Sequence, residues 1–206
     1  MALKFIYFDM GKVLLRFDRD RQYRQMAEVA GVTPEKVHDA IMDSGLNDLY
    51  ESGRINSDEF FSQFCESTGA RCDFERLWRA GSDIFWPNRS IIPLVANLSS
   101  AGFRLGIMSN TSPSHWKWIC RQGFCIVPAF FEPVVLSYDV GAMKPNDAMF
   151  AAAAVQAQVK ADEIFFVDDL DENVRGAKEF GMDAVVYSTT LALASDLRQR
   201  GLRFSY

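Results

Sequence analysis

Four short apolar runs stand out along the chain, each bounded by polar or turn-forming residues. They cover residues 4–8, 103–108, 164–167 and 184–187, and a fifth, weaker run covers residues 133–136. Short continuous apolar runs are typical of strands that are buried on both faces of a parallel sheet. The pattern therefore predicts five parallel strands.

Helical patterns lie between the predicted strands. They cover residues 90–100, 113–122, 146–158 and 171–180, and the last of them ends before Gly181. Strands that alternate with helices indicate an α/β protein with an open parallel sheet. We therefore expect a Rossmann-like α/β fold with helices on both faces of the sheet.

Residues 17–86 interrupt this alternation. They contain helix-start signals, such as Thr33-Pro34-Glu35 and Asn56-Ser57-Asp58-Glu59, but no convincing strand. Because the chain has no repeats and no low-complexity linker, we interpret this segment as a helical cap inserted after the first strand and packed over the sheet. The remaining residues, 1–16 and 87–206, would form the α/β core.

Composition narrows the classes of partner. The chain has 206 residues, of which 49% are hydrophobic, enough for one sizeable core. The net charge is −5 with acidic and basic residues interspersed, so the basic patch of a nucleic-acid-binding protein is missing. The sequence shows neither a membrane-spanning apolar segment nor a signal peptide. We expect a cytoplasmic monomer or homodimer that binds neither nucleic acid nor membrane.

Polar residues follow several predicted strands directly. Asp9 follows the first strand, Ser109 and Asn110 follow the second, Asp168-Asp169 follows the run at 164–167, and Lys144 lies beyond the weaker strand. Ligands of open parallel sheets bind beyond the carboxyl ends of the strands, where these side chains should converge. Each residue alone is readily explained as a helix cap or turn residue. Their common position at one sheet edge favours a site.

These residue types suit a phosphate group and a hard cation. Asp9 and Asp168 offer the carboxylate oxygens with which proteins commonly bind Mg²⁺. The Ser109 hydroxyl can donate to a phosphoryl oxygen, and the Lys144 ammonium can neutralise its charge. A carboxylate can also be the nucleophile of phosphoryl transfer, forming an aspartyl phosphate that water cleaves. The sequence therefore predicts a Mg²⁺ site and a small phosphorylated substrate.

Four motifs along nearly the whole chain together resemble the haloacid dehalogenase-like hydrolase superfamily. In order, they are FIYFDMGKVL, IMSNTS, SYDVGAMKP and FFVDDLDENVRGA. The expected cap lies between the first two, as in that superfamily. The D-x-G form of the first motif resembles the branch that includes bacterial phosphatases acting on glucose 1-phosphate.

The resemblance implies a role for each matched residue on the substrate side. Asp9 would be the nucleophile and also a Mg²⁺ ligand. Ser109 and Lys144 would bind the transferring phosphoryl group, and Lys144 would pair with Asp9. Asn110 would hold its loop or touch the substrate.

On the metal side, the resemblance implies that Asp168 is a Mg²⁺ ligand, with Asp169 as a further ligand or as support beside it. Gly11 departs from the family pattern, because most phosphatases of the superfamily carry there an aspartate that transfers protons and whose backbone carbonyl binds Mg²⁺. Gly11 keeps that carbonyl but loses the acid, and positioned proton transfer is typically worth ~10²–10⁴-fold in rate. A glycine also suits a backbone with unusual dihedral angles or a close approach.

The loss at Gly11 leaves several alternatives. The enzyme could use substrates whose leaving group needs little protonation, another acid such as Asp169, Asp18 or Glu51 could substitute, or the protein could be a weak or inactive relative that binds phosphorylated ligands. Dehalogenation through Asp9 is less favoured, because that reaction needs no metal, whereas Asp168, Asp169 and Gly11 fit a Mg²⁺ site. We expect a Mg²⁺-dependent phosphomonoester hydrolase of a small metabolite, such as a sugar phosphate.

The segment from Glu51 to Ile55 resembles the cap turn of the family, which has the form E-x-G-x-I. Tyr50 or Arg54 could face the site from there, although a helix end with Gly53 as its C-cap is the simpler interpretation. His115 and Trp116 follow the SNTS loop, and we expect both to face the cap or to pack in the core, since a lone histidine is weak evidence for catalysis.

Overall fold

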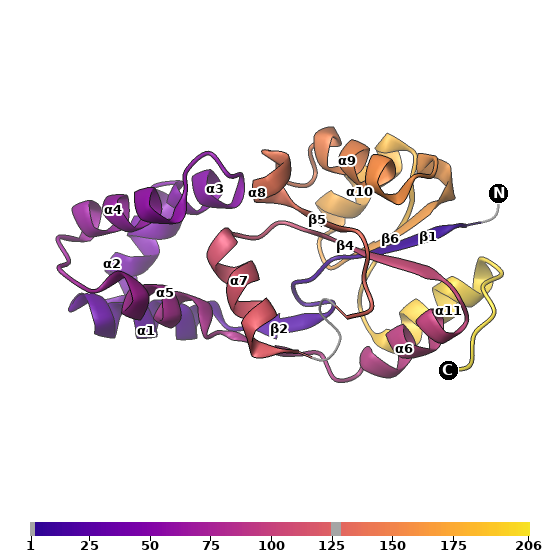
Figure 1. Cartoon of the computed structure of the whole chain (residues 1–206), viewed down its shortest axis with the longest axis horizontal. Coiled ribbons are helices and arrows are strands. Elements are labelled where there is room, and N and C mark those ends of the chain that lie inside the picture. Colours follow the sequence, from indigo (N-terminus) through magenta and orange to yellow (C-terminus); the bar gives the residue numbers. More distant parts are fainter. Residues whose placement is uncertain (1–2, 125–128) are drawn as a thin grey trace.

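A five-stranded parallel sheet forms the centre of the protein (Figure 1). The computed structural model describes residues 3–124 and 129–206. In spatial order, the strands are β5 (Val134–Leu136), β4 (Arg104–Ser109), β1 (Phe5–Phe8), β6 (Ile164–Asp168) and β7 (Asp183–Val186). All neighbouring strands pair in parallel. The predicted α/β class is confirmed, and each predicted strand is found within one residue of its expected bounds.

Helices cover both faces of this sheet. The helices on the two faces are α9 (Asp147–Ala157) and α10 (Asp171–Phe180) on one, and α6 (Ile92–Ser100) and α11 (Thr190–Gln199) on the other. Alternate residues of β1 point to opposite faces. Phe5 and Tyr7 pack against α9 and α10, whereas Ile6 and Phe8 pack against α6 and α11. This double burial explains why β1 is apolar at every position.

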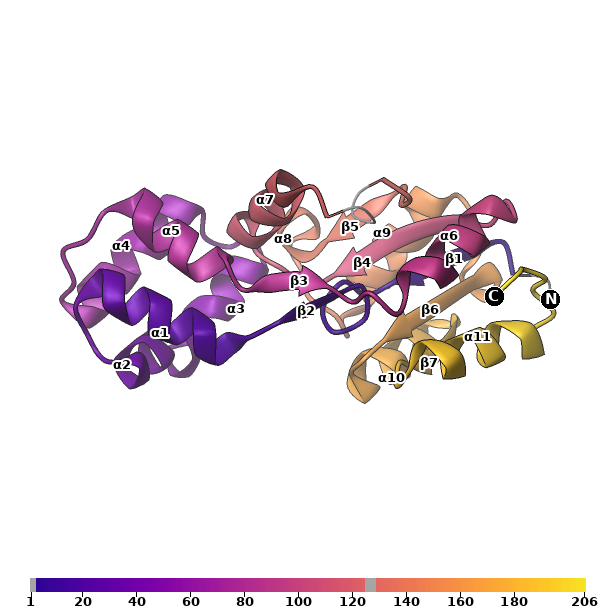
Figure 2. The ribbon, with the colours of Figure 1, turned by 90° about the horizontal axis from the view of Figure 1, so that it is seen from below.

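Residues 19–82 form a helical layer at one end of the molecule, which we call the helical lobe (Figures 1 and 2). It comprises α1 (Arg19–Ala30), α2 (Pro34–His38), a π-helical turn (Asp39–Asp43), α3 (Leu46–Glu51), α4 (Ser57–Thr68) and α5 (Phe74–Ser82). Its helices bury a core of their own, which includes Met26, Ile41, Phe64 and Leu77. Among the described residues, every helix is too short or too polar to cross a membrane.

Two short strands join the helical lobe to the sheet. They are β2 (Leu15–Phe17) and β3 (Phe85–Pro87), which pair in antiparallel fashion as a narrow ribbon (Figure 2). The expectation that residues 17–86 lack strands is therefore wrong at both edges of that segment. Strands of three residues are too short to show a hydrophobic period.

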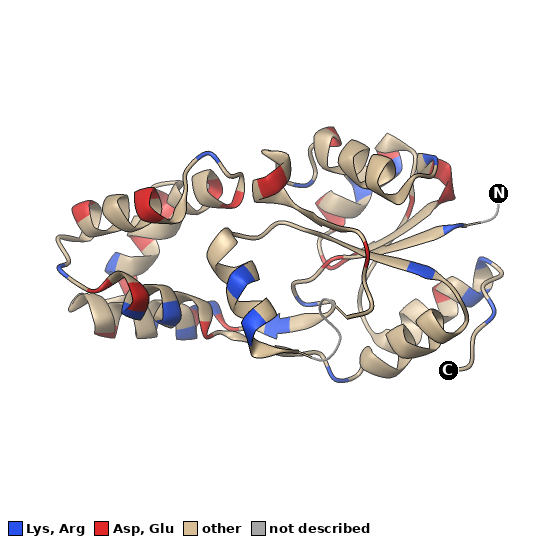
Figure 3. Ribbon diagram, in the orientation of Figure 1, with Lys and Arg blue, Asp and Glu red and all other residues tan. Residues whose placement is uncertain are grey.

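Helix α7 (Pro113–Gln122) and the single turn α8 (Ser137–Val140) complete the described helices of the α/β part, together with a short 3₁₀ turn at Ala161–Glu163. The observed helices confirm the four predicted ones, and α11 is the long helix that the sequence pattern did not predict. Acidic and basic residues are interspersed over the whole molecule (Figure 3).

The hydroxyl of Tyr7 ties β1 to the helix above it, and its removal should be measurable. It donates a buried hydrogen bond of 2.9 Å to the Ala153 carbonyl of α9. Tyr7→Phe should lower the free energy of unfolding by about 1 kcal/mol, the net worth of one such bond. Urea unfolding measures this, with exposed Tyr206→Phe as the matched control. Equal midpoints for the two variants would contradict the assignment.

Candidate active site

Three central strands end at the edge of the sheet that faces the helical lobe (Figure 1). Asp9 follows β1 directly, Ser109 is the last residue of β4, and Asp168 is the last residue of β6. The backbone N–H of Asp9 also donates to the Val167 carbonyl at 2.8 Å, which keeps β1 paired with β6 up to the site. The structure thus brings these predicted side chains together.

The ammonium group of Lys144 lies between two of these carboxylates. It donates to Asp9 Oδ1 at 2.7 Å, to Asp168 Oδ2 at 2.6 Å and to the Met108 carbonyl at 2.8 Å. Burial disfavours its charged form, but the carboxylates of Asp168 and Asp9 outweigh that effect and raise the pKa of Lys144 above its ordinary value. The pairing with Asp9 was predicted, and the pairing with Asp168 is additional.

Asn110 holds the loop that carries Lys144. Its Nδ2 donates to the Lys144 carbonyl at 3.0 Å, and its Oδ1 accepts from the Lys144 N–H at 2.8 Å. On the far side, Pro145 packs so closely on α10 that a Cβ at Gly176 would lie 2.7 Å from Pro145 Cβ. Of the two expectations for Asn110, the structure shows the loop-holding one.

Asn173 is a site residue that the sequence reasoning did not assign. From α10, its Nδ2 donates to both carboxylate oxygens of Asp168, at 3.1 and 3.0 Å. The Leu170 N–H adds a third bond of 2.8 Å to Asp168 Oδ1, so this fully buried carboxylate is fixed in orientation. Asn173 Oδ1 is itself buried and has no hydrogen-bond partner among residues 3–124 and 129–206. A buried acceptor without a donor beside carboxylates indicates a place for a hydrated ligand.

Three carboxylates at this edge form a donor set suited to a hard cation. One oxygen from each of Asp9, Asp168 and Asp169 lies within 4.8 Å of the others. Asp169 also accepts a 3.2 Å ion pair from Lys12. An oxygen-only set of this kind, next to the unpartnered amide oxygen of Asn173, fits the coordination preferences of Mg²⁺.

Burial, and to a smaller extent the neighbouring carboxylates, change the proton affinity of Asp9. Burial raises the pKa of Asp9 to about 7, against the opposing effect of Lys144, and the negative charges of Asp168 and Asp169 add to the increase. The single ammonium of Lys144 therefore does not fully compensate the negative charge of the three carboxylates. A cation bound in the cleft would stabilise the charged form of Asp9.

Gly11 is packed closely beside the site. A Cβ at Gly11 would lie 3.1 Å from Phe17 Cε1 and 3.6 Å from Asp9 Oδ2, so the close-approach interpretation of this glycine holds. The interpretation by unusual dihedral angles is wrong, because the residue with positive φ in this turn is Lys12, at 54°. The Asp9 Oδ2 oxygen, which Lys144 does not occupy, faces this position.

A cleft of about 430 Å³ opens above these residues, between the sheet edge and the helical lobe. Its volume lies within the range of small-molecule sites. The lobe contributes Arg19, Met42, Asp48 and Glu51 to the wall, and Phe17 and Phe85 of the ribbon line it as well. The cleft is therefore lined by charged and polar side chains on one hand and by a substantial apolar surface on the other.

The two residues suggested for the cap turn do not line the cleft. Arg54 is exposed, and the Tyr50 hydroxyl contacts Ser57 and Ser114 instead. The turn is a helix end as predicted, but the C-cap of α3 is Ser52. Gly53 follows it with a φ of +69° and donates its N–H to the Tyr50 carbonyl. His115 is buried, and its Nε2 lies 3.2 Å from the Gly81 carbonyl, which supports a packing role.

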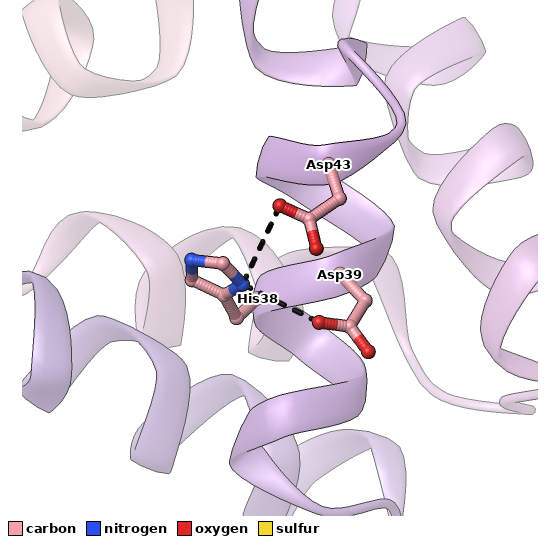
Figure 4. Close-up of side chains that lie close together, drawn as sticks. All are labelled: His38, Asp39 and Asp43. Atoms are coloured by element: carbon pink, nitrogen blue, oxygen red, sulfur yellow. Dashed lines mark hydrogen bonds and ion pairs between the residues drawn. The ribbon is translucent and has the colours of Figure 1, made fainter.

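A second group of potential ligands lies on the outer surface of the helical lobe. His38 Nδ1 lies 3.4 Å from Asp39 Oδ1 and 3.9 Å from Asp43 Oδ1, while the other ring nitrogen points away from both carboxylates (Figure 4). These side chains are 46% to 68% exposed. Exposed ion pairs of this kind contribute little energy, and the group remains a surface feature.

The fold and this site define a family. Residues 4–181 match the haloacid dehalogenase-like hydrolases, and the chain belongs to that family. It is 25% identical over 186 residues to D-ribitol-5-phosphate phosphatase of Bacteroides thetaiotaomicron, covering 88% of this chain and 90% of the relative. It is 37% identical over 101 residues to glyceraldehyde 3-phosphate phosphatase of Methanopyrus kandleri, covering 48% of this chain and 42% of the relative.

Solved structures agree with this assignment. A haloacid dehalogenase family enzyme of Bacteroides thetaiotaomicron, in complex with magnesium and inorganic phosphate, superposes with a TM-score of 0.81 at 25% identity. The match covers 91% of this chain and 96% of that structure. The predicted superfamily is thus confirmed, and the chain is a hydrolase with phosphatase relatives. The narrower branch acting on glucose 1-phosphate stays a prediction.

Removal of the shared ammonium should destabilise the protein strongly. Lys144→Met leaves two buried carboxylates without a counter-charge, which should lower the free energy of unfolding by about 3–5 kcal/mol at about pH 8. The loss should shrink as the pH falls, because Asp9 can then bind a proton in the folded state. Chemical unfolding in chelator measures both effects. Lys4→Met, whose side chain is 59% exposed, is the control, and an equal loss in it would contradict the prediction.

His115 should make the fold sensitive to mild acid. Burial and, secondarily, the nearby Arg19 charge lower the pKa of His115 to about 3 from an ordinary 6.5. Its contribution is therefore complete above pH 6.5 and is lost as the pH falls toward 3, because the unfolded imidazole binds a proton first. His115→Gln should reduce the slope of unfolding free energy between about pH 6 and 4 by up to about 1.4 kcal/mol per pH unit. Exposed His38→Gln serves as the control. If His115→Gln and the unaltered protein show the same pH dependence of the unfolding free energy, the prediction is refuted.

Proposed function

We propose that this protein is a Mg²⁺-dependent phosphomonoester hydrolase of a small phosphorylated metabolite, such as a sugar or polyol phosphate. The observation that carries the proposal is the Lys144 ammonium shared by Asp9 and Asp168 at the floor of a cleft of about 430 Å³. The relatives named above, which act on ribitol 5-phosphate and glyceraldehyde 3-phosphate, support this substrate class.

Asp9 is the nucleophile in this proposal. Lys144 occupies Oδ1 and leaves Oδ2 free to attack phosphorus. The attack forms a bond between Asp9 and phosphorus and breaks the bond to the leaving oxygen, which takes up a proton. Water then attacks the aspartyl phosphate, releases inorganic phosphate and regenerates the Asp9 carboxylate.

The neighbouring residues hold the phosphoryl group and its charge. The buried Ser109 hydroxyl donates only a long 3.3 Å bond to the Asn110 carbonyl, so it can turn to a phosphoryl oxygen at little cost. Lys144 supplies a positive charge at a position fixed by Asn110. Asp9, Asp168, Asp169 and the Gly11 carbonyl would hold Mg²⁺, which supplies Lewis-acid stabilisation when bound.

The helical lobe acts as the substrate-selecting cap. In this proposal, residues 17–86 form the cap, and residues 1–16 and 87–206 form the core that performs the chemistry. The lobe places charged side chains on the cleft wall, and such groups recognise the hydroxyls of a sugar or polyol better than an apolar chain.

A second candidate is a phosphate-binding relative that turns over slowly or not at all. The specific observation in its favour is that no side chain is present at Gly11, where the family acid would stand. Dehalogenation is not favoured, because the clustered carboxylates of Asp9, Asp168 and Asp169 suit a metal-assisted reaction on phosphate.

Phosphate release from a panel of sugar, polyol, acyl and aryl phosphates tests the proposal. We expect turnover that requires Mg²⁺, stops with chelator and falls by more than about 10³-fold in Asp9→Asn, because the nucleophile is lost. Asp43→Asn, whose side chain is 68% exposed on the outer surface of the lobe, is the matched control.

Two results would contradict the proposal in different ways. Turnover that survives in Asp9→Asn would place the chemistry elsewhere. Tight binding of Mg²⁺ and inorganic phosphate without release from any compound would establish the binding-protein alternative.

A further inference from the structure

Three carboxyl groups were candidates to replace the missing acid, namely Asp18, Asp169 and Glu51, and the structure distinguishes them. Asp18 is the N-cap of α1, and its Oδ1 accepts the Arg21 N–H at 2.9 Å. It also lies 3.9 Å from Arg24 and does not line the cleft. Asp18 therefore cannot reach a substrate in this arrangement.

Asp169 lines the cleft, but its carboxylate is engaged by other groups. Its carboxylate pairs with Lys12 at 3.2 Å, and it belongs to the carboxylate cluster with Asp9 and Asp168. Its contacts are thus with a cation and with two carboxylates that lie at the same place. Asp169 is better suited to support a cation.

Glu51 combines access to the cleft with a setting that favours a proton. It lies at the end of α3 and lines the same cleft as Asp9, yet its side chain is only 8% exposed. The salt-bridge partner that faces it from α1, Arg19, is 3.6 Å away, longer than a good charged hydrogen bond. Burial raises the pKa of Glu51 above its ordinary value, Asp48 on the same helix adds to this, and Arg19 and Asn47 oppose it.

The backbone of Glu51 is anchored to the loop that carries the predicted phosphate-binding residues. Ser137 Oγ donates to the Glu51 carbonyl at 2.5 Å and accepts the Thr111 N–H at 3.0 Å. One hydroxyl thus joins α3 of the lobe to the segment just after Ser109 and Asn110. This contact sets the position of the Glu51 backbone relative to the loop that follows β4.

Close packing next to Glu51 reinforces this anchor. A Cβ at Gly53 would lie 2.2 Å from the Tyr138 carbonyl of α8, and the φ angle of Gly53 is +69°. Only glycine tolerates both conditions. The end of α3 is therefore held against the α/β part by two contacts, one at the Glu51 carbonyl and one at Gly53. These contacts fix the position of the Glu51 backbone relative to the sheet.

We propose that Glu51 transfers the protons that the absent side chain at Gly11 cannot transfer; the inference rests on the proposed phosphatase function. As Asp9 attacks phosphorus and the bond to the leaving oxygen breaks, that oxygen takes the proton of the Glu51 carboxyl group. The resulting carboxylate then accepts a proton from the water that attacks the aspartyl phosphate. Each turnover returns Glu51 to its protonated form, so protons balance.

Dependence on the leaving group tests this role. Two substrates are compared. One is the aryl ester p-nitrophenyl phosphate, and the other is the sugar or polyol phosphate with an alkyl leaving group that the unaltered protein hydrolyses fastest. In Glu51→Gln, formation of the aspartyl phosphate should slow by about 10²–10⁴-fold with the alkyl phosphate and change by less than about threefold with the aryl phosphate, which leaves without a proton. Because the second step also loses its base, p-nitrophenol should appear as a burst followed by slow turnover.

Two further variants separate chemistry from structure. Asp48→Asn alters a carboxyl group on the same helix and in the same cleft, and it should change both substrates by the same factor. Glu51→Asp keeps the carboxyl group and should recover part of the alkyl rate, which also covers the case in which Glu51→Gln does not fold. Circular dichroism and thermal unfolding establish the folded state of each variant.

The inference is overturned if Glu51→Gln slows formation of the aspartyl phosphate equally with both substrates, if it leaves that step unchanged with both, or if the unaltered protein hydrolyses only acyl and aryl phosphates. In the last case, easy leaving groups replace the acid. Failure of the proposed function looks different, because then the unaltered protein releases no phosphate with Mg²⁺, or Asp9→Asn remains active.

Discussion

The buried ammonium group of Lys144 is the interaction on which the rest of the site depends. It bonds to Asp9 after β1, to Asp168 of β6 and to the Met108 carbonyl of β4, and so joins three adjacent strands at one edge. Buried charges are tolerated only when they are paired and hydrogen-bonded. The Asn110 amide and the close contact of Pro145 with Gly176 keep the lysine in place. The same contacts thus hold the sheet edge together and set its charge.

Much of the α/β part could be predicted from local pattern. A strand buried on both faces has to be apolar throughout, so β1 and β6 were recognisable from short runs of sequence. Residues that follow parallel strands meet at one edge whatever the details of packing. That rule alone brought Asp9, Ser109 and Asp168 together, and the family resemblance added roles to the positions.

Other features depend on contacts between distant parts of the chain. The three-residue strands of the ribbon exist because they pair with each other, and neither has a pattern of its own. Asn173 stands within the fourth motif but received no role, because an asparagine on a helix is ordinarily a surface residue. The three candidate acids, Asp18, Glu51 and Asp169, could not be ranked from the sequence. Only the fold shows that Asp18 caps a helix while Glu51 faces the cleft.

The ribbon that joins the helical lobe to the sheet also bears on how the chain folds. Strands β1 and β4 are neighbours in the sheet, although Phe5 pairs with Arg104 across the whole lobe. Because Leu15 pairs with Pro87, the lobe is closed off as a side branch, and the loop between β1 and β4 becomes effectively much shorter. Each halving of a loop lowers the entropic cost of closing it by about 0.6 kcal/mol. Early pairing of this ribbon would therefore let the central strands meet while the helical lobe is still assembling.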